Sequence, residues 1–157
     1  MIPHGTGGRV AVANRQRRLK INTRRLADIA EYTLELVGDR QLQLGIVLVD
    51  DAAIARLNAQ YHYTPGATDI LSFAYGEGQG ELIISVEHAV SQARRYRTTA
   101  ARELVLYVVH GILHLHGYND LTAPERRRMR AAERRLVSQL CRHLAFGSLI
   151  SRRLLKR

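Results

Sequence analysis

The chain has little cysteine and no long apolar run, and each absence excludes a class of protein. Among its 157 residues Cys141 is the single cysteine, which excludes an internal disulfide and suits a reducing cytosol. No apolar run approaches the ~18 residues of a membrane-spanning helix, and the first residues lack the apolar stretch of a signal peptide. We therefore expect a soluble, cytoplasmic protein with no membrane and no disulfide partner.

The chain also lacks internal repeats and linkers. Its length and its hydrophobic content of 46% are enough to bury a core, so we expect a single domain over residues 1–157. Residues 1–8 contain three glycines and no hydrophobic pattern, which predicts disorder. Residues 148–157 form a basic tail with the pattern of one or two amphipathic turns, and the sequence leaves open whether the tail packs on the domain.

Acidic residues are scarce at both ends of the chain. Residues 1–25 hold seven basic and no acidic side chains, residues 26–120 hold six and twelve, and residues 121–157 hold eleven and two. Basic ends around an acidic middle indicate a footprint for a polyanion, and nucleic acid fits this pattern best. A solvated, solubilising face with a frayed tail is the alternative, and charge alone does not separate RNA from DNA.

Hydrophobic spacing predicts about four strands and about five helices, and hence an α+β fold. Short β-type runs between turn residues predict strands at residues 10–13, 42–49, 70–75 and 81–85. Apolar residues spaced by three and four behind capping residues predict helices at residues 23–37, 51–61, 86–96, 99–115 and 122–147. Both alternating sets of the second strand are largely apolar, so we expect it to be covered on both faces. Residues 15–20 are predicted to be a basic connector.

The helix predicted to end near Leu115 carries two histidines on one side. Residues four apart on a helix lie ~40° apart around its axis, so His110 and His114 point the same way and can share one ion. Gly117 is expected to end the helix in a left-handed turn that swings Asp120 back toward the histidines. Two nitrogens from the helix and one oxygen from the turn leave a fourth position open, which is the layout of a catalytic zinc site. The spacing resembles the zincin helix and turn, with Asp where a third His is usual.

Other interpretations of this helix are weaker. Hydrolytic zincins carry a Glu after the first His as general base, but Gly111 stands there, so an ordinary zinc peptidase is not expected. Two histidines at this spacing can also form a simple polar seam. Here the flanking side chains are apolar and predict a buried helix, in which unpartnered histidines would be costly. His116 points away from the pair and is interpreted as a surface residue outside the site.

Three stretches of the chain, in the same order, resemble the YbeY family of bacterial metal-dependent endoribonucleases. Residues 110–120 resemble the family pattern H-G-x-L-H-L-x-G-Y-D-H. Residues 57–62 and 67–73 resemble L-N-x-x-Y-R and P-T-D-V-L-S-F, and residues 79–85 resemble L-G-D-I-x-I-S. The similarity extends over residues 10–143.

The resemblance implies an α+β fold with a mixed four-stranded sheet packed with helices, and one zinc ion (Zn2+) per chain on three side chains. It implies cleavage of single-stranded RNA in rRNA maturation and ribosome quality control, with rRNA or ribosomal particles as partners. It also accounts for Gly111, since the family has glycine there. Two departures stand out. The third ligand, His in the family, is Asp120, which can still bind zinc and leaves manganese or nickel less excluded. The Arg after the family's tyrosine is His62, which could contact phosphate when protonated or transfer a proton near neutral pH.

No motif identifies the general base of such an enzyme. His62, Asp69 and Glu81 are candidates because their motifs flank the strands expected to line the cleft. For each of them a cap, a turn or an exposed polar position is an equal alternative.

Arginines follow directly after the expected ligand turn. Arg126, Arg127 and Arg130 could hold RNA backbone there, although solvated surface arginines are ordinary. The leading hypothesis is a zinc-dependent, single-strand-specific endoribonuclease. The alternatives are a ribosome- or RNA-binding assembly factor with a structural metal and, with less support, a zinc peptidase-like hydrolase.

Overall fold

The computed structural model of the chain describes residues 8–61 and 70–154. Within these residues it contains six strands and five helices. Their bounds in chain order are β1 (Val10–Asn14), β2 (Leu19–Ile21), α1 (Thr23–Leu36), β3 (Gln43–Val49), α2 (Asp51–Tyr61), β4 (Ile70–Gly76), β5 (Gln79–Ser85), α3 (Val86–Tyr96), α4 (Ala100–Leu115), α5 (Ala123–His143) and β6 (Ile150–Leu154). Residues 62–69, which include the candidates His62 and Asp69, and most of the predicted disordered segment at residues 1–8 lie outside the described residues. None of the described helices is both long enough and apolar enough to cross a membrane.

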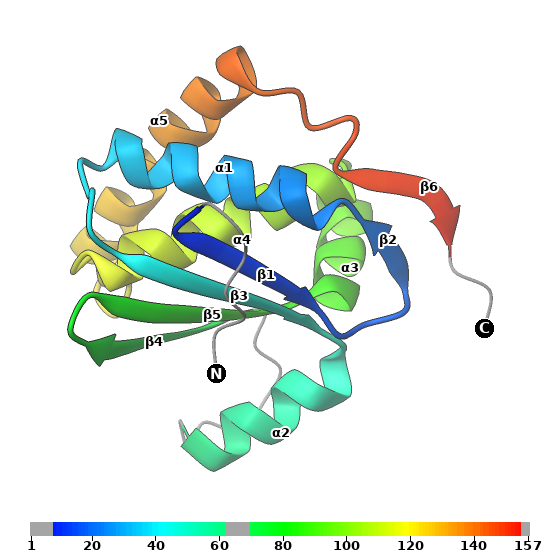
Figure 1. Ribbon diagram of the computed structural model, residues 1–157, viewed down its shortest axis with the longest axis horizontal. Helices are drawn as coiled ribbons and strands as arrows, with labels where there is room; N and C mark the ends of the chain where they lie inside the picture. The colour runs from blue at the N-terminus through cyan, green and yellow to red at the C-terminus, as the bar shows by residue number, and fades with distance from the viewer. Residues whose placement is uncertain (1–7, 62–69, 155–157) are drawn as a thin grey trace.

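The main sheet contains four strands in the order β1-β3-β5-β4. β1, β3 and β5 are parallel, and β4 pairs antiparallel with β5. β4 and β5 form a hairpin, whose turn consists of Glu77 and Gly78, both at positive φ. The predicted α+β fold with a mixed four-stranded sheet is therefore confirmed (Figure 1).

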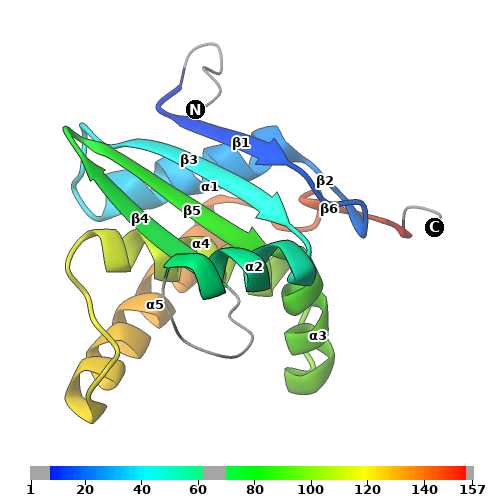
Figure 2. The same ribbon diagram turned by 90° about the horizontal axis from the view of Figure 1, so that it is seen from below.

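Helices cover both faces of this sheet. α1 and α4 lie on one face, with α5 outside α4, and α2 lies on the other face (Figure 1, Figure 2). In β3, Leu44, Ile46 and Leu48 are at most 1% exposed within the main core. Val47 and Val49 of the same strand belong to a second apolar cluster beneath α2. This strand is covered on both faces, as its sequence predicts.

α4 is buried because most of its faces are apolar. Thr99 caps its first turn by accepting a hydrogen bond from the backbone N–H of Arg102. The nine buried residues of the helix are Glu103, Leu104, Val105, Tyr107, Val108, Val109, Gly111, Ile112 and Leu113. At Gly111 the helix comes so close to the sheet that an added Cβ would lie 2.6 Å from Leu82 Cδ2 and 2.7 Å from Ile70 Cδ1. A larger residue at this position would have to displace the Leu82 and Ile70 side chains, so the close approach of α4 to β4 and β5 favours glycine here.

The two basic ends of the chain meet in a second, two-stranded sheet. Leu19 and Ile21 of β2 are buried and pair antiparallel with β6, so the predictions of a connector at residues 15–20 and of helical turns in the tail were wrong. Leu149 is fully buried just before β6, and its carbonyl oxygen accepts a hydrogen bond from the Asn22 N–H, 2.8 Å away. The pairing joins opposite ends of the sequence, and no local pattern signals it.

α5 begins as predicted and ends early. Thr122 and Glu125 form a capping box, with proline in the first turn. Its buried residues are Met129, Ala132, Leu136, Val137 and Leu140, and Leu144 after them is half-buried. Leu144 has extended backbone angles and ends the helix at His143, before the predicted Gly147.

Candidate metal centre

His110 and His114 lie next to each other on α4, one helical turn apart. Their Nε2 atoms are 3.0 Å apart, and the rings meet edge to face with centroids 4.5 Å apart. The side chains are 23% and 27% exposed, so both are largely withdrawn from water. Two imidazole nitrogens this close need a shared proton or a shared cation between them, since two bare lone pairs repel.

The turn after α4 brings Asp120 back to the histidines, as predicted. The backbone N–H groups of Gly117 and Tyr118 donate to carbonyl oxygens in the last turn of the helix, and Gly117 has a φ of 88°. This is a Schellman motif, in which glycine takes the left-handed position without steric cost. Asp120 Oδ2 lies 3.6 Å from His110 Nε2 and 3.4 Å from His114 Nε2.

The three side chains form a group that could hold a metal ion. One ligand atom from each residue lies within 4.8 Å of the others. Asp120 is 39% exposed and is the most accessible of the three, so solvent and solutes can reach the cluster. One helix and its following turn therefore supply the whole candidate ligand set.

Glu133 of α5 adds a contact that the sequence interpretation missed. The Nδ1–H of His110 donates to Glu133 Oε1 at 2.6 Å, and the carboxylate is 14% exposed. A proton on Nδ1 leaves the Nε2 lone pair directed at the cluster, which is the tautomer that a metal ligand needs. A signal did exist. Glu133 is the one acidic residue of α5 outside its capping box, and it lies one turn after the buried Met129.

His116 is not a simple surface residue. Its side chain is 23% exposed, and its Nε2 lies 2.7 Å from Asp39 Oδ2, in the loop between α1 and β3. Burial alone would raise the pKa of Asp39, but hydrogen bonds from the backbone N–H groups of Gln41 and Leu42 and from the His116 ring lower that pKa to about 2. The His116–Asp39 contact connects the end of α4 with the loop between α1 and β3. As predicted, His116 lies outside the cluster of His110, His114 and Asp120.

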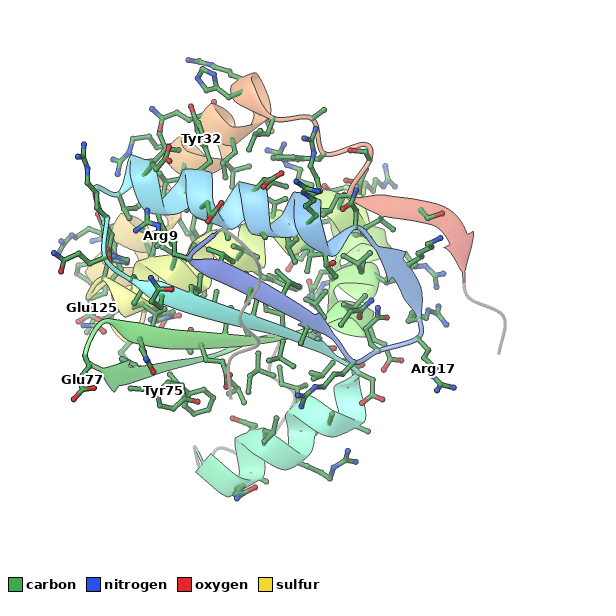
Figure 3. All side chains as sticks on the ribbon, in the orientation of Figure 1. Arg9, Arg17, Tyr32, Tyr75, Glu77 and Glu125 are labelled. Carbon is green, nitrogen blue, oxygen red and sulfur yellow. The ribbon has the colours of Figure 1, made fainter. Side chains whose placement is uncertain are left out.

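The structure does not bring Glu81 to the cluster. An added Cβ on Gly80 would lie 3.1 Å from Leu115 Cδ1, so Gly80 faces α4 and Glu81, the next residue of β5, faces the opposite side of the sheet. There Glu81 Oε1 accepts a hydrogen bond from the hydroxyl of Tyr75, which points to the side of the sheet that α2 covers (Figure 3). The other two candidates for the base, His62 and Asp69, lie outside the described residues and stay predictions.

Gly111 has a structural reason to differ from the Glu of hydrolytic zincins. It points at β4 and β5, and even a methyl group would collide with Leu82 and Ile70. A glutamate at this position would point at the sheet and would have to displace the side chains of Leu82 and Ile70. The close contact of α4 with the sheet therefore removes the general base on which peptidase chemistry of that kind depends.

A cavity of about 250 Å³ adjoins the cluster between α4 and α5. His110 of α4 and Asp120 line it, together with Arg126, Arg130 and Glu133 of α5. Arg126 lies near the turn at residues 117–120, which we call the ligand turn, because its Nη1 donates to the Leu121 carbonyl oxygen, 2.9 Å away.

Of the three arginines predicted to bind RNA, the structure brings two to this cavity. Arg127 is exposed but does not line it, because each residue advances ~100° around a helix. Arg126 and Arg130 are one turn apart and share a side of α5.

The fold and the cluster define an α+β protein with a candidate metal centre on one helix and its turn. The family model described as endoribonuclease YbeY matches residues 11–141. The chain is 36% identical over 143 residues to the endoribonuclease YbeY of Geobacter metallireducens, with 84% of this chain and 95% of that protein covered. It is 37% identical over 131 residues to that of Heliobacterium modesticaldum, with 71% and 79% covered. The chain therefore belongs to the endoribonuclease YbeY family, as its motifs predict.

A solved structure supports the fold. The solution structure of a protein from Thermotoga maritima matches with a TM-score of 0.61 at 24% sequence identity. The match covers 83% of this chain and 88% of that one.

Proposed function

We propose that the chain is a zinc-dependent endoribonuclease that cleaves single-stranded RNA in the cytoplasm, in rRNA maturation and ribosome quality control. The observation that carries the proposal is the cluster of His110, His114 and Asp120, which opens beside an arginine-lined cavity. Membership of a family named for endoribonuclease activity supplies the reaction class.

Zinc fits the donor set of the cluster. Ligand atoms bound to tetrahedral zinc at ~2.0–2.2 Å lie roughly 3.3–3.6 Å from one another. The three separations here are 3.0, 3.4 and 3.6 Å, close to that geometry before any adjustment of side chains. When bound, zinc would supply Lewis acidity toward a phosphodiester and make water available as a nucleophile near pH 7.

The remaining roles belong to side chains of this chain. Glu133 accepts the Nδ1–H of His110 and so holds that ring with its Nε2 lone pair toward the ligands. Arg126 and Arg130 place positive charge in the adjoining cavity, where a phosphate group of RNA would lie next to the cluster. His62 and Asp69 are proposed as candidates for proton transfer, and Glu81 is not, because it faces the other side of the sheet.

Metal analysis of the purified protein combined with an RNA cleavage assay tests this function. We expect about one zinc per chain and cleavage of single strands that stops on addition of a chelator and returns with zinc. Salt-dependent RNA binding without metal-dependent cleavage would instead identify an assembly factor with a structural metal. Cleavage of a peptide and not of RNA would identify a peptidase-like hydrolase.

A further inference from the structure

A second cavity continues the one beside the metal cluster. It has a volume of about 290 Å³ and extends between α4 and α5 toward the start of α4. The two cavities share Leu106, Arg130 and Glu133 in their walls, so they adjoin, and we call them together the α4–α5 groove. One end of the groove is the metal cluster, and the other end lies beside Arg102 and Arg134.

Arginines line this groove at regular intervals. Arg126, Arg130 and Arg134 repeat every fourth residue on α5, and each step advances ~6 Å along the helix axis. Arg102 extends from α4 on the opposite wall. All four side chains are exposed, so their charges are available to a ligand along the length of the groove.

The acidic groups of the groove do not cancel this charge. Glu133 is hydrogen-bonded to His110, and Asp120 belongs to the ligand cluster. Glu103 is only 8% exposed. Four arginines stand against these three carboxylates, so the lining of the groove carries a net positive charge, and the four arginines are its exposed charged groups apart from the half-buried acids.

We propose that the α4–α5 groove binds the phosphates of single-stranded RNA on one side of the scissile bond. This inference rests on the proposed function, because it takes the metal cluster as the place of cleavage. Arg126 and Arg130 bind phosphates next to the cluster, and Arg102 and Arg134 bind phosphates further along the same strand. Cleavage efficiency consequently depends on nucleotides that lie beyond those at the metal.

The double variant Arg102→Gln/Arg134→Gln tests the far end of the groove. Its matched control is Arg135→Gln/Arg142→Gln, which removes the same charge from exposed positions on the other side of α5. Binding of a single RNA strand is measured by fluorescence anisotropy over a salt series, with chelator present so that no cleavage occurs. Each lost contact should lower the salt slope by ~0.7, which weakens binding by the groove variant about tenfold at 0.15 M salt. The control should bind nearly as the parent does.

Cleavage separates failure of this inference from failure of the proposed function. We expect the groove variant to keep its zinc content and its cleavage of a dinucleotide, and to lose efficiency on a longer strand mainly through a higher KM. Equal binding and equal cleavage by the groove and control variants would overturn the inference while leaving the nuclease intact. A parent that cleaves no RNA would overturn the proposed function, and the inference with it. The binding comparison would then report only on RNA affinity.

Discussion

Replacing Glu133 should weaken metal binding at a centre to which Glu133 is not itself a ligand. In Glu133→Ala the Nδ1–H of His110 loses an acceptor 2.6 Å away, and the ring becomes free to turn its Nε2 away from the cluster. Losing a partner of this kind lowers metal affinity by roughly 10–100-fold, or about 1.4–2.8 kcal/mol. The carboxylate is only 14% exposed, so water replaces it poorly and we expect a value in the upper half of this range.

Glu133→Gln should lie between the parent and the Ala variant. Its amide oxygen can still accept the Nδ1–H, but the bond loses its charge assistance. Zinc affinity is measured by competition with a chromophoric chelator, on protein whose folding is checked by circular dichroism.

Glu125→Ala is the control for the loss of a carboxylate from the same helix. Glu125 closes the capping box of α5, so its removal should lower the free energy of unfolding by about 1 kcal/mol and leave zinc affinity unchanged. If Glu133→Ala binds zinc as tightly as Glu125→Ala does, then Glu133 does not orient His110 and the reasoning is refuted.

Three further predictions concern the ligand turn, the close approach of α4 and the loop that binds His116. Asp120→Ala should lose zinc and Asp120→His should keep it with an altered pH dependence of cleavage; full zinc content in Asp120→Ala would show that Asp120 is not a ligand. Gly111→Ala should lower the free energy of unfolding by about 1–2 kcal/mol in urea, because overpacking against the buried Leu82 exceeds the gain in helix propensity. The pKa of Asp39 is lowered from 3.8 to about 2, so its carboxylate stabilises the fold fully above about pH 4 and loses this effect toward pH 2. Asp39→Asn should therefore cost about 1–2 kcal/mol at pH 7 and almost nothing at pH 2, and an equal cost at both pH values would contradict this assignment.

Local chemistry made much of the fold predictable. The helices begin within a residue of the predicted starts, behind N-caps at Asn22, Ser85, Thr99 and Thr122, because a cap depends only on a side chain and the next three residues. Non-local pairing was not predictable in this way. β2 and β6 lie near opposite ends of the sequence and pair with each other, and the sequence of neither segment indicates which strand it will pair with.

In the candidate metal centre too, the local features were predictable from the sequence and the non-local contact was not. His110 and His114 share a side of α4 because of helical periodicity, and Gly117 returns Asp120 to them through a local turn, so the sequence alone determined the candidate ligand set. Only the tertiary structure decided that Glu133 supports His110, because that contact depends on how α5 packs across α4.

The same limit applies to side chains whose orientation depends on neighbouring elements. Gly80 of β5 faces α4, so Glu81, the next residue of the strand, faces the opposite side of the sheet and away from the cluster. The sequence alone does not show which face of a strand will pack against which helix. Arg130 reached the groove and Arg127 did not because the buried face of α5 sets its rotation. The sequence of a single helix or strand shows which of its residues share a face. The rotation of that element and the angle at which it crosses a neighbour depend on how the side-chain surfaces of both elements pack together.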